Sequence, residues 1–380
     1  MAVRRCLPSG ACQWVRVWNL PVRIVHWSMV ACYVIAWSTR SSRYLDIHVF
    51  AGYTLGGLVG FRLVWGVIGG PYARFRDFRF GWRQVLGHLR TVLRGEAEPF
   101  IGHNPAGSVI IYLLLAFSAV VAVTGLLTLG AEERQGPLAG VASFAWGEWF
   151  HGLHEGLAWF TLVIVSVHLA GVAVESVLLR ENLVAPMISG FKRSVTAAVS
   201  VPPRRGTGAV LLLAIALFGA YWFGGYLTAS ADDPYRPFTG PALAQDSAWM
   251  EECGGCHLAY HPSLLPERSW VMLLRQQASH FGEDLFLDAE TLSRLEHFAV
   301  ANAAERAATE AAWKMNRTIP GAEIPLRITG TPYWKQKHQG LPESVWRHES
   351  VGGRSHCEAC HLDAEAGTFE DAAMRLPNGF

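Results

Sequence analysis

The chain has 380 residues, of which 51% are hydrophobic and 17% charged, and its formal net charge is +1. This apolar excess excludes an intrinsically disordered protein, and the length allows two or three domains. The net charge conceals two unlike parts: residues 1–228 carry 19 Lys and Arg against 10 Asp and Glu, whereas residues 229–380 carry 13 against 21. A basic, hydrophobic part is joined to an acidic, more polar one, which excludes a single ordinary soluble globule.

Five apolar stretches approach the roughly 20 residues that a helix needs to cross a bilayer. In chain order they are residues 24–37, 47–68, 106–129, 150–179 and 208–227. The first is short, and residues 15–20 are a candidate extension of it. The fourth is long enough to tilt or to emerge from the membrane at one end. None alternates as barrel strands do, so we expect five membrane-spanning helices.

The distribution of positive charge predicts the orientation of these spans. With a cytoplasmic N-terminus, the three inner segments 1–23, 69–105 and 180–206 hold 15 Lys and Arg, whereas the two outer loops hold three. The positive-inside rule therefore places the N-terminus in the cytoplasm and residues 229–380 in the periplasm. Because these arginines lie between spans, no nucleic-acid partner is expected. The N-terminus also lacks the small-residue site of a cleaved signal peptide.

Histidines inside the spans are candidates for function, because ionisable residues are rare in lipid. His154 and His168 are 14 residues apart in the fourth span. Around the helix axis their side chains therefore point only ~40° apart, and the two residues lie roughly 21 Å apart along one helix face. His151 points ~100° away from His168 and fits less well. His88 and His103 lie in an inner loop and are expected to be ordinary surface residues.

The direction of each span suggests how these histidines pair. His26 and His168 should lie near the inner surface, and His48 and His154 near the outer one. Because a haem iron can be bound on both faces by neutral imidazoles, two such pairs predict two haem b sites in a helical bundle. His26 is three residues from Arg23, whereas His168 is twelve from the next inner charge. The fourth span must therefore continue past the inner site or tilt.

Several segments resemble the bacterial cytochrome b561 family, which includes the b-type subunit of nickel–iron hydrogenases. They are residues 17–27, 47–53 and 61–66, together with 154–156 followed by His168. The resemblance covers about residues 14–195. It implies a four-helix bundle that holds two haems b, with His26, His48, His154 and His168 as ligands. Arg62 is a candidate partner of an inner haem propionate, and a role in topology alone is the alternative.

Two C-x-x-C-H motifs lie in the acidic part: Cys253, Cys256 and His257, then Cys357, Cys360 and His361. This spacing lets two thiols bind one haem covalently while the histidine ligates its iron. A zinc ribbon would separate its cysteine pairs by about 15–20 residues, and here the gap is about a hundred. A thioredoxin-like site would need a βαβ setting, which is not apparent. We therefore predict two haems c, which are attached on the outer face of bacterial membranes.

The distal ligands of these haems are open among several residues: His261, His280, His297, His338, His348, His356 and, as an alternative, Met315. His261 and His356 are constrained by their closeness to the motifs. Residues 256–260, 264–270, 280–284 and 327–332 resemble the dihaem cytochrome c family, and the resemblance covers about residues 250–377. It implies two bis-histidine haems, with His280 the distal ligand of the first and His338 of the second. Family members are often encoded with a b-type cytochrome and a small oxygen-binding c-type haem protein. Here the dihaem cytochrome c and the b-type cytochrome are fused in one chain.

Together these patterns predict an all-α protein of the bacterial inner membrane. Residues 1–206 would form the four-span haem b domain, 207–228 a fifth helix that tethers the outer part, and 229–249 a linker. Residues 250–380 would form a mainly α, loop-rich periplasmic domain with two haems c. No proton-transfer or nucleophilic cluster stands out, so the chemistry is that of the cofactors.

The expected function is electron transfer between the membrane and a periplasmic acceptor through two haems b and two haems c. The alternatives are quinol or superoxide oxidation, a gas-binding module, and the membrane anchor of a larger dehydrogenase. Expected partners are lipid, quinone or quinol, and a periplasmic c-type cytochrome or oxygen-binding haem protein. Further copies of the chain or subunits of a larger complex are also considered. The acidic outer part would suit a basic partner through electrostatic steering.

Overall fold

The computed structural model describes residues 13–41, 44–96, 99–194, 201–228, 242–370 and 373–376. The chain forms two compact units. Unit 1 comprises Met1–Gly125 and His151–Ala231, and unit 2 comprises Leu126–Phe150 and Asp232–Phe380. The predicted domain boundaries at residues 206, 228 and 249 stay predictions. Residues 229–241 of the predicted linker lie outside the described residues, and α8 begins within the rest of it.

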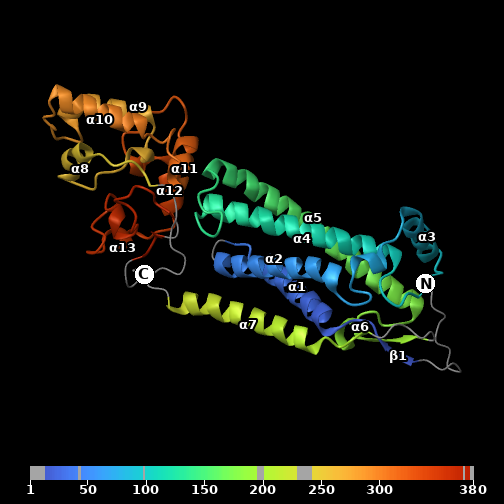
Figure 1. Ribbon diagram of the computed structural model, residues 1–380. Helices are drawn as coiled ribbons and strands as arrows, with labels where there is room; N and C mark the ends of the chain where they lie inside the picture. Colours follow the sequence, from blue (N-terminus) through green and yellow to red (C-terminus); the bar gives the residue numbers. More distant parts are fainter. Residues whose placement is uncertain are drawn as a thin grey trace. The chain divides into compact units, whose positions relative to one another are not determined.

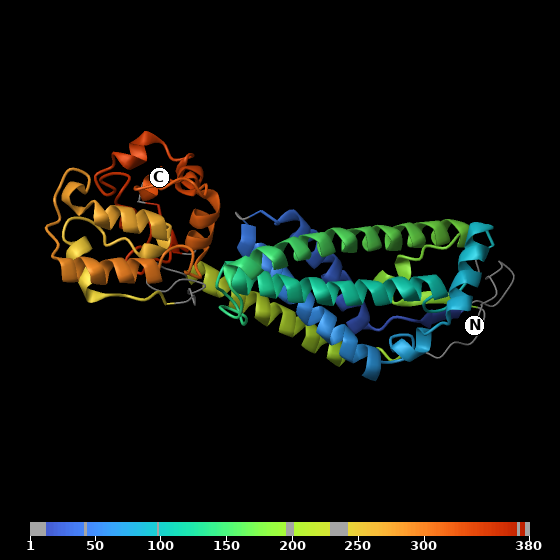
Figure 2. The same ribbon diagram turned by 90° about the horizontal axis from the view of Figure 1, so that it is seen from above.

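Five long apolar helices, which Figures 1 and 2 show side by side, confirm the predicted spans. They are α1 (Leu20–Ser38), α2 (Leu45–Ile68), α4 (Pro105–Glu132), α5 (Phe144–Leu179) and α7 (Arg205–Thr228). Exposed valines and leucines such as Val34, Val67 and Leu217, each more than 60% exposed, face outward from these helices. Such a surface suits lipid and not water, so these helices contact the membrane.

The fifth helix does more than connect two parts. In unit 1, α1 packs against both α2 and α7. Val25 and Cys32 of α1 and Leu55 of α2 form a buried cluster, and Leu211 and Ile215 of α7 pack against it. We predicted α7 only as a tether, because it carries no histidine. Its apolar face also completes the core between the first two spans.

A two-stranded antiparallel sheet closes the end of unit 1 where α1 begins. Strand β1 (Gln13–Arg16) pairs with β2 (Phe191–Ser194), with Gln13 opposite Ser194. The helix α1 then starts at Leu20, because the Asn19 side chain accepts a hydrogen bond from Val22 N at 3.2 Å and caps it. The suggested extension of the first span over residues 15–20 is therefore wrong up to Asn19, because α1 begins only at Leu20 and strand pairing takes the backbone groups of residues 13–16.

The segment between α2 and α4 forms the 3-10 helix η2 (Phe75–Phe78) and the amphipathic α3 (Trp82–Leu93), and α6 (Ala185–Ser189) follows α5. His88 of α3 is only 6% exposed and lies 2.9 Å from a carboxylate oxygen of Glu175 on α5. Asn104 donates to both oxygens of that carboxylate, at 2.7 and 2.6 Å. The expectation that His88 is an ordinary surface residue is wrong, because Glu175 supplies a buried partner 87 residues away.

Unit 2 contains short helices joined by loops, as predicted. They are α8 (Ser247–Gly254), η3 (Pro262–Leu264), α9 (Glu267–Arg275), η4 (Gln277–Ser279), α10 (Ala289–Ala301), α11 (Glu310–Thr318), η5 (Ile328–Gly330), α12 (Pro332–His338), α13 (Glu343–Trp346) and η6 (Cys357–Ala359). One core cluster gathers Trp249 of α8, Trp270 of α9, Leu295 of α10 and Leu265, which follows η3. Large aromatic residues therefore supply much of the apolar burial in a domain with little regular structure.

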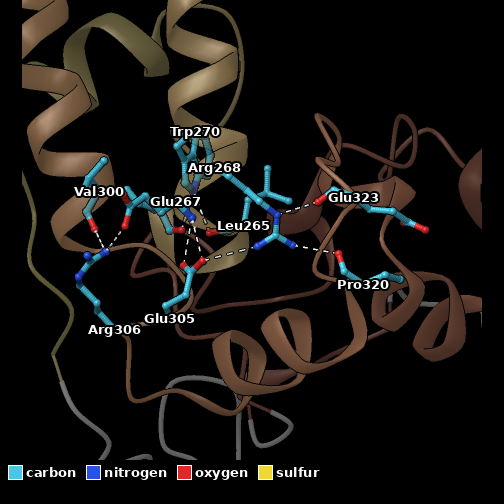
Figure 3. A network of polar contacts seen from close by, with 10 residues as sticks. Leu265, Glu267, Arg268, Trp270, Val300, Glu305, Arg306, Pro320 and Glu323 are labelled. Carbon is cyan, nitrogen blue, oxygen red and sulfur yellow. Dashed lines mark hydrogen bonds and ion pairs between the residues drawn. The ribbon is translucent and has the colours of Figure 1, made fainter.

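A polar network fixes α9 to two loops of unit 2 (Figure 3). The Glu305 carboxylate accepts from Glu267 N at 3.0 Å and lies 3.9 Å from a guanidinium nitrogen of Arg268. Arg268 also donates to the main-chain oxygens of Glu323 at 2.7 Å and Pro320 at 3.2 Å. Because a guanidinium presents several donors in fixed directions, one side chain can join all three segments.

Candidate functional site

His48 of α2 and His154 of α5 face each other in unit 1, with ring centroids 6.1 Å apart. His48 Nδ1 lies 2.9 Å from the main-chain oxygen of Ala36, and His154 Nδ1 lies 3.0 Å from that of Val121. A carbonyl oxygen can only accept, so each Nδ1 carries the ring proton and each Nε2 keeps its lone pair. This tautomer is the one that binds a metal through Nε2.

The spacing of these rings fits one metal ion between them. Two metal–imidazole bonds of about 2.0 Å, with roughly 1.1 Å from each nitrogen to its ring centre, put the centroids about 6.2 Å apart. Gly125 of α4 borders the same site, because a Cβ there would lie 3.0 Å from His154 Cε1. A residue without a side chain at this position therefore leaves room for the imidazole.

His26 of α1 and His168 of α5 are close enough to interact electrostatically. His26 Nδ1 is shielded from solvent and has no hydrogen-bond partner among the described residues. Arg62, 8% exposed, lies over the rings of Phe75 and Phe78, and its Nη1 likewise has no partner in the described part of the chain. Shielded donors without partners suit a bound group with acidic substituents, as a haem propionate has.

His103 is a residue whose role the sequence did not reveal. Its ring lies 4.7 Å from that of Trp18 and 4.4 Å from that of Phe78. It interacts electrostatically with Arg62 and His168, and burial lowers its pKa, so the ring is neutral. The expectation of an ordinary surface histidine is wrong here too. The sequence shows only that His103 lies just before a span. It does not show that aromatic rings from two distant segments enclose the residue.

The first C-x-x-C-H motif lies at the end of α8. The ring centroids of its His257 and of His280, which follows η4, are 6.3 Å apart. His257 Nδ1 lies 2.7 Å from the main-chain oxygen of Leu258, whereas His280 Nδ1 is shielded from solvent without a partner among the described residues. Burial lowers the pKa of His280, which keeps its ring neutral. The structure thus brings together the motif and the distal candidate that the resemblance implied for it.

The second motif, on η6 and the two residues after it, has the same arrangement. The His361 ring centroid is 6.2 Å from that of His338, the last residue of α12. His338 Nδ1 lies 2.8 Å from the main-chain oxygen of Trp334, and the rings of His338 and Trp334 stack with their centroids 4.4 Å apart. Burial lowers the pKa of His338, and the ring is therefore neutral. A neutral imidazole with a bonded Nδ1 leaves Nε2 available to a metal.

Two other distal candidates have their polar atoms engaged elsewhere. Ser263 N donates to His261 Nδ1 at 3.1 Å, and His261 Nε2 lies 3.0 Å from the Ala244 main-chain oxygen, so both ring nitrogens are used. The Met315 sulfur accepts from Thr331 Oγ1 at 3.2 Å in a buried setting. Within the described ranges no cluster of three or more His, Cys, Asp or Glu has the geometry of a metal site. Nothing there therefore favours the zinc alternative.

Several curated proteins are similar to the first part of the chain. A probable Ni/Fe-hydrogenase B-type cytochrome subunit from Azotobacter chroococcum is 26% identical over 212 residues, which cover 47% of this chain and 88% of that protein. The protein of the same name from Bradyrhizobium diazoefficiens is 27% identical, covering 47% of this chain and 86% of that protein.

Solved structures are similar to the second part. A diheme cytochrome c from Rhodobacter sphaeroides is 36% identical, with a TM-score of 0.30, over 34% of this chain and all of that chain. A diheme cytochrome type c from Shewanella baltica is 28% identical, with a TM-score of 0.29, over 36% of this chain and 96% of that chain.

Two family models match separate parts of the chain. The model of prokaryotic cytochrome b561 matches residues 17–190, which contain His26, His48, His154 and His168. The model of dihaem cytochrome c matches residues 249–369, which contain both C-x-x-C-H motifs. These families imply haem b in the first part and haem c in the second. The first part of the chain is therefore a cytochrome b561 and nickel–iron hydrogenase b-type cytochrome domain, and a dihaem cytochrome c domain follows it.

Proposed function

We propose that this protein is a membrane-bound tetrahaem electron-transfer protein, linking quinol or another membrane donor to a periplasmic acceptor. His26 with His168, and His48 with His154, would hold two haems b. The two C-x-x-C-H motifs would hold two haems c, with His280 and His338 as distal ligands. Bound haem supplies reversible one-electron chemistry, and the axial ligands and the burial of the site set its potential.

The observation that carries this proposal is the common spacing of three histidine pairs. Their ring centroids are 6.1, 6.3 and 6.2 Å apart, in two unrelated domains. Each separation matches the about 6.2 Å expected when two imidazoles share one metal. A haem iron that took both imidazoles of a pair, besides its four porphyrin nitrogens, would have no open position for oxygen or another small molecule. The spacing therefore favours electron transfer over gas binding.

The charge distribution supports an orientation with the N-terminus in the cytoplasm. The segments between α2 and α4 and between α5 and α7 carry ten Lys and Arg, and those between α1 and α2 and between α4 and α5 carry three. Under the positive-inside rule, the dihaem domain then lies in the periplasm. A periplasmic c-type cytochrome or a small oxygen-binding haem protein would be its redox partner, and the excess of acidic residues suits a basic one.

A second candidate function is the membrane anchor of a larger dehydrogenase. The match of residues 17–190 to b-type subunits of hydrogenases favours it. In that case the protein would purify from native membranes with a catalytic subunit. If the protein instead purifies as a single chain and quinol reduces all its haems, the result supports the tetrahaem electron-transfer protein.

The test begins with the haem content of the purified, detergent-solubilised chain. The pyridine haemochrome spectrum should show two haems b and two haems c per chain, and a reduced short-chain quinol should reduce both kinds. Carbon monoxide should leave the reduced spectrum unchanged, because each iron is six-coordinate. Another haem ratio, or rapid binding of carbon monoxide, contradicts the proposal.

A further inference from the structure

Helix α3 carries an exposed row of large apolar side chains, Trp82, Leu86, Leu89 and Leu93, which we call the α3 stripe. These four residues are between 36 and 86% exposed. Their spacings of four, three and four residues place the side chains within ~60° of one another around the helix axis. Single exposed apolar residues are ordinary on a protein surface, but a continuous row of them marks a surface that contacts something apolar. The α3 stripe therefore indicates an apolar environment on this side of the helix.

A different flank of α3 is fixed to the membrane helices of unit 1. Val85 and His88 are buried on this flank. His88 lies 2.9 Å from Glu175 in the last turns of α5, and its ring centroid lies 5.4 Å from that of Phe100. Figures 1 and 2 show α3 at the ends of α4 and α5, running across their direction and not continuing either of them. Because α5 is a membrane span, a helix fixed across its end lies along the membrane surface.

Arginines border the opposite side of the α3 stripe. Arg83 and Arg90 are exposed, and their side chains point ~80–100° from that of Trp82, on the border away from the buried flank. Residues 69–95 carry six Arg and a single Asp, which pairs with Arg74 at 3.0 Å. The charge of this segment is therefore strongly positive. An apolar stripe bordered by arginines is typical of a helix that lies in a membrane interface and attracts anionic lipid.

We propose that α3 lies in the membrane surface and binds anionic phospholipid, with the α3 stripe against the acyl chains and Arg83 and Arg90 at the headgroup phosphates. Trp82 suits this depth, because an indole ring prefers the boundary between acyl chains and headgroups. The lipid around the spans is continuous with this surface, so no further partner is needed to cover the stripe. The inference goes beyond the proposed function and does not depend on haem.

The test uses the full chain in lipid nanodiscs, with one fluorophore on α3. Leu89→Cys carries the label in a Cys6→Ser and Cys12→Ser background, since Cys32 is buried and the other cysteines belong to the C-x-x-C-H motifs. Phospholipids brominated near the headgroup end of their acyl chains should quench this label, relative to discs of unbrominated lipid. Gly87→Cys is the matched control, because it points ~160° away from Leu89 around the axis, and a Cβ there would meet nothing within 4 Å. Its label should be quenched much less.

A second arm compares two headgroups in the same discs. Brominated phosphatidylglycerol should quench the Leu89→Cys label more than brominated phosphatidylcholine, because each arginine near an anionic surface favours binding by about fivefold. Arg90→Gln should lower this preference by about two- to fivefold. Arg40→Gln removes the same charge between α1 and α2, at the end of α2 away from α3, and should leave the preference unchanged.

Two results would overturn the inference. If brominated lipid quenches the Leu89→Cys label no more than the Gly87→Cys label, the α3 stripe does not face acyl chains, and protein such as a second copy of the chain covers it instead. If the two headgroups quench equally, or if Arg90→Gln and Arg40→Gln respond alike, the arginines of α3 do not select anionic lipid. Haem content enters neither measurement, so failure here is distinct from failure of the proposed function.

Discussion

The two units position pairs of imidazoles by different means. In unit 1 the candidate ligands lie on helices of 19, 24 and 36 residues, and two of the rings bond to main-chain oxygens of other helices. In unit 2 each pair joins a C-x-x-C-H motif to the end of a short helix, and covalent bonds would anchor the macrocycle. Long helices can fix a ligand by register alone, whereas a loop-rich domain gains from a covalent anchor, because it has less packed structure to restrain the cofactor.

Loss of one ligand in unit 1 should have the largest effect, because nothing covalent retains a haem there. His154→Ala should lower the haem b content from two to one per chain and leave both haems c in place. The pyridine haemochrome spectrum measures this ratio. His151→Ala, one turn earlier on α5, is the matched control and should keep both haems b. Retention of two haems b in His154→Ala would show that His154 is not a ligand.

Loss of a distal ligand in unit 2 should have a smaller effect, because the cysteines keep the haem attached. His280→Met should retain two haems c and raise the potential of one of them, within the ~0.8 V range that axial ligands span. A redox titration followed optically measures the change. His297→Met, an exposed position on α10, provides the comparison and should leave all potentials unchanged. Release of the haem from His280→Met would remove the proposed difference between the units.

The smallest predicted effect concerns pH and is confined to unit 2. Burial, with a further contribution from Glu310, raises the pKa of Glu370 from 4.5 to about 8. Between these values the folded form binds a proton that the unfolded form releases, so this contribution to stability is full below pH 4.5 and is lost as pH rises through about 8. Glu370→Gln should therefore flatten the fall in thermal midpoint of the dihaem domain between pH 5 and 9.

The control for this prediction is Glu365→Gln, because Glu365 is exposed on the same loop. Its midpoint should follow the wild-type curve. The midpoint can be followed by the absorbance of the haems c in the full, detergent-solubilised chain. Parallel curves for Glu370→Gln and the wild type would show that the Glu370 carboxyl does not titrate in this range.

Much of unit 1 could be predicted because its signals are local. Apolar length predicted five spans, and helical periodicity placed His154 and His168 on one face. The burial of His88 and His103 could not be predicted, because it depends on Glu175 and on the rings of Trp18 and Phe78, which are far away in the sequence. The pairing of β1 with β2 was missed for the same reason, since four-residue strands carry little pattern of their own.

In unit 2 the motifs predicted covalent haem, whereas spacing alone left six histidines open as distal ligands. The resemblance to dihaem cytochromes c selected His280 and His338, which the structure places opposite the two motif histidines. That selection stays a prediction until the ligands are tested. The grouping of segment 126–150 with this unit had no signal in the sequence, because Arg134 contacts a main-chain oxygen, and such contacts leave no pattern of side chains.

The hydrogen bonds from Nδ1 of His48, His154 and His338 all end on main-chain oxygens, those of Ala36, Val121 and Trp334. A main-chain acceptor is present whatever side chain the residue carries. The ring orientation is therefore insensitive to substitution at Ala36 and Val121, provided that the helices persist. In such sites the neighbouring residues can change while the histidine ligand stays the same. The same ligand geometry could therefore be transferred to designed helices with quite different apolar sequences.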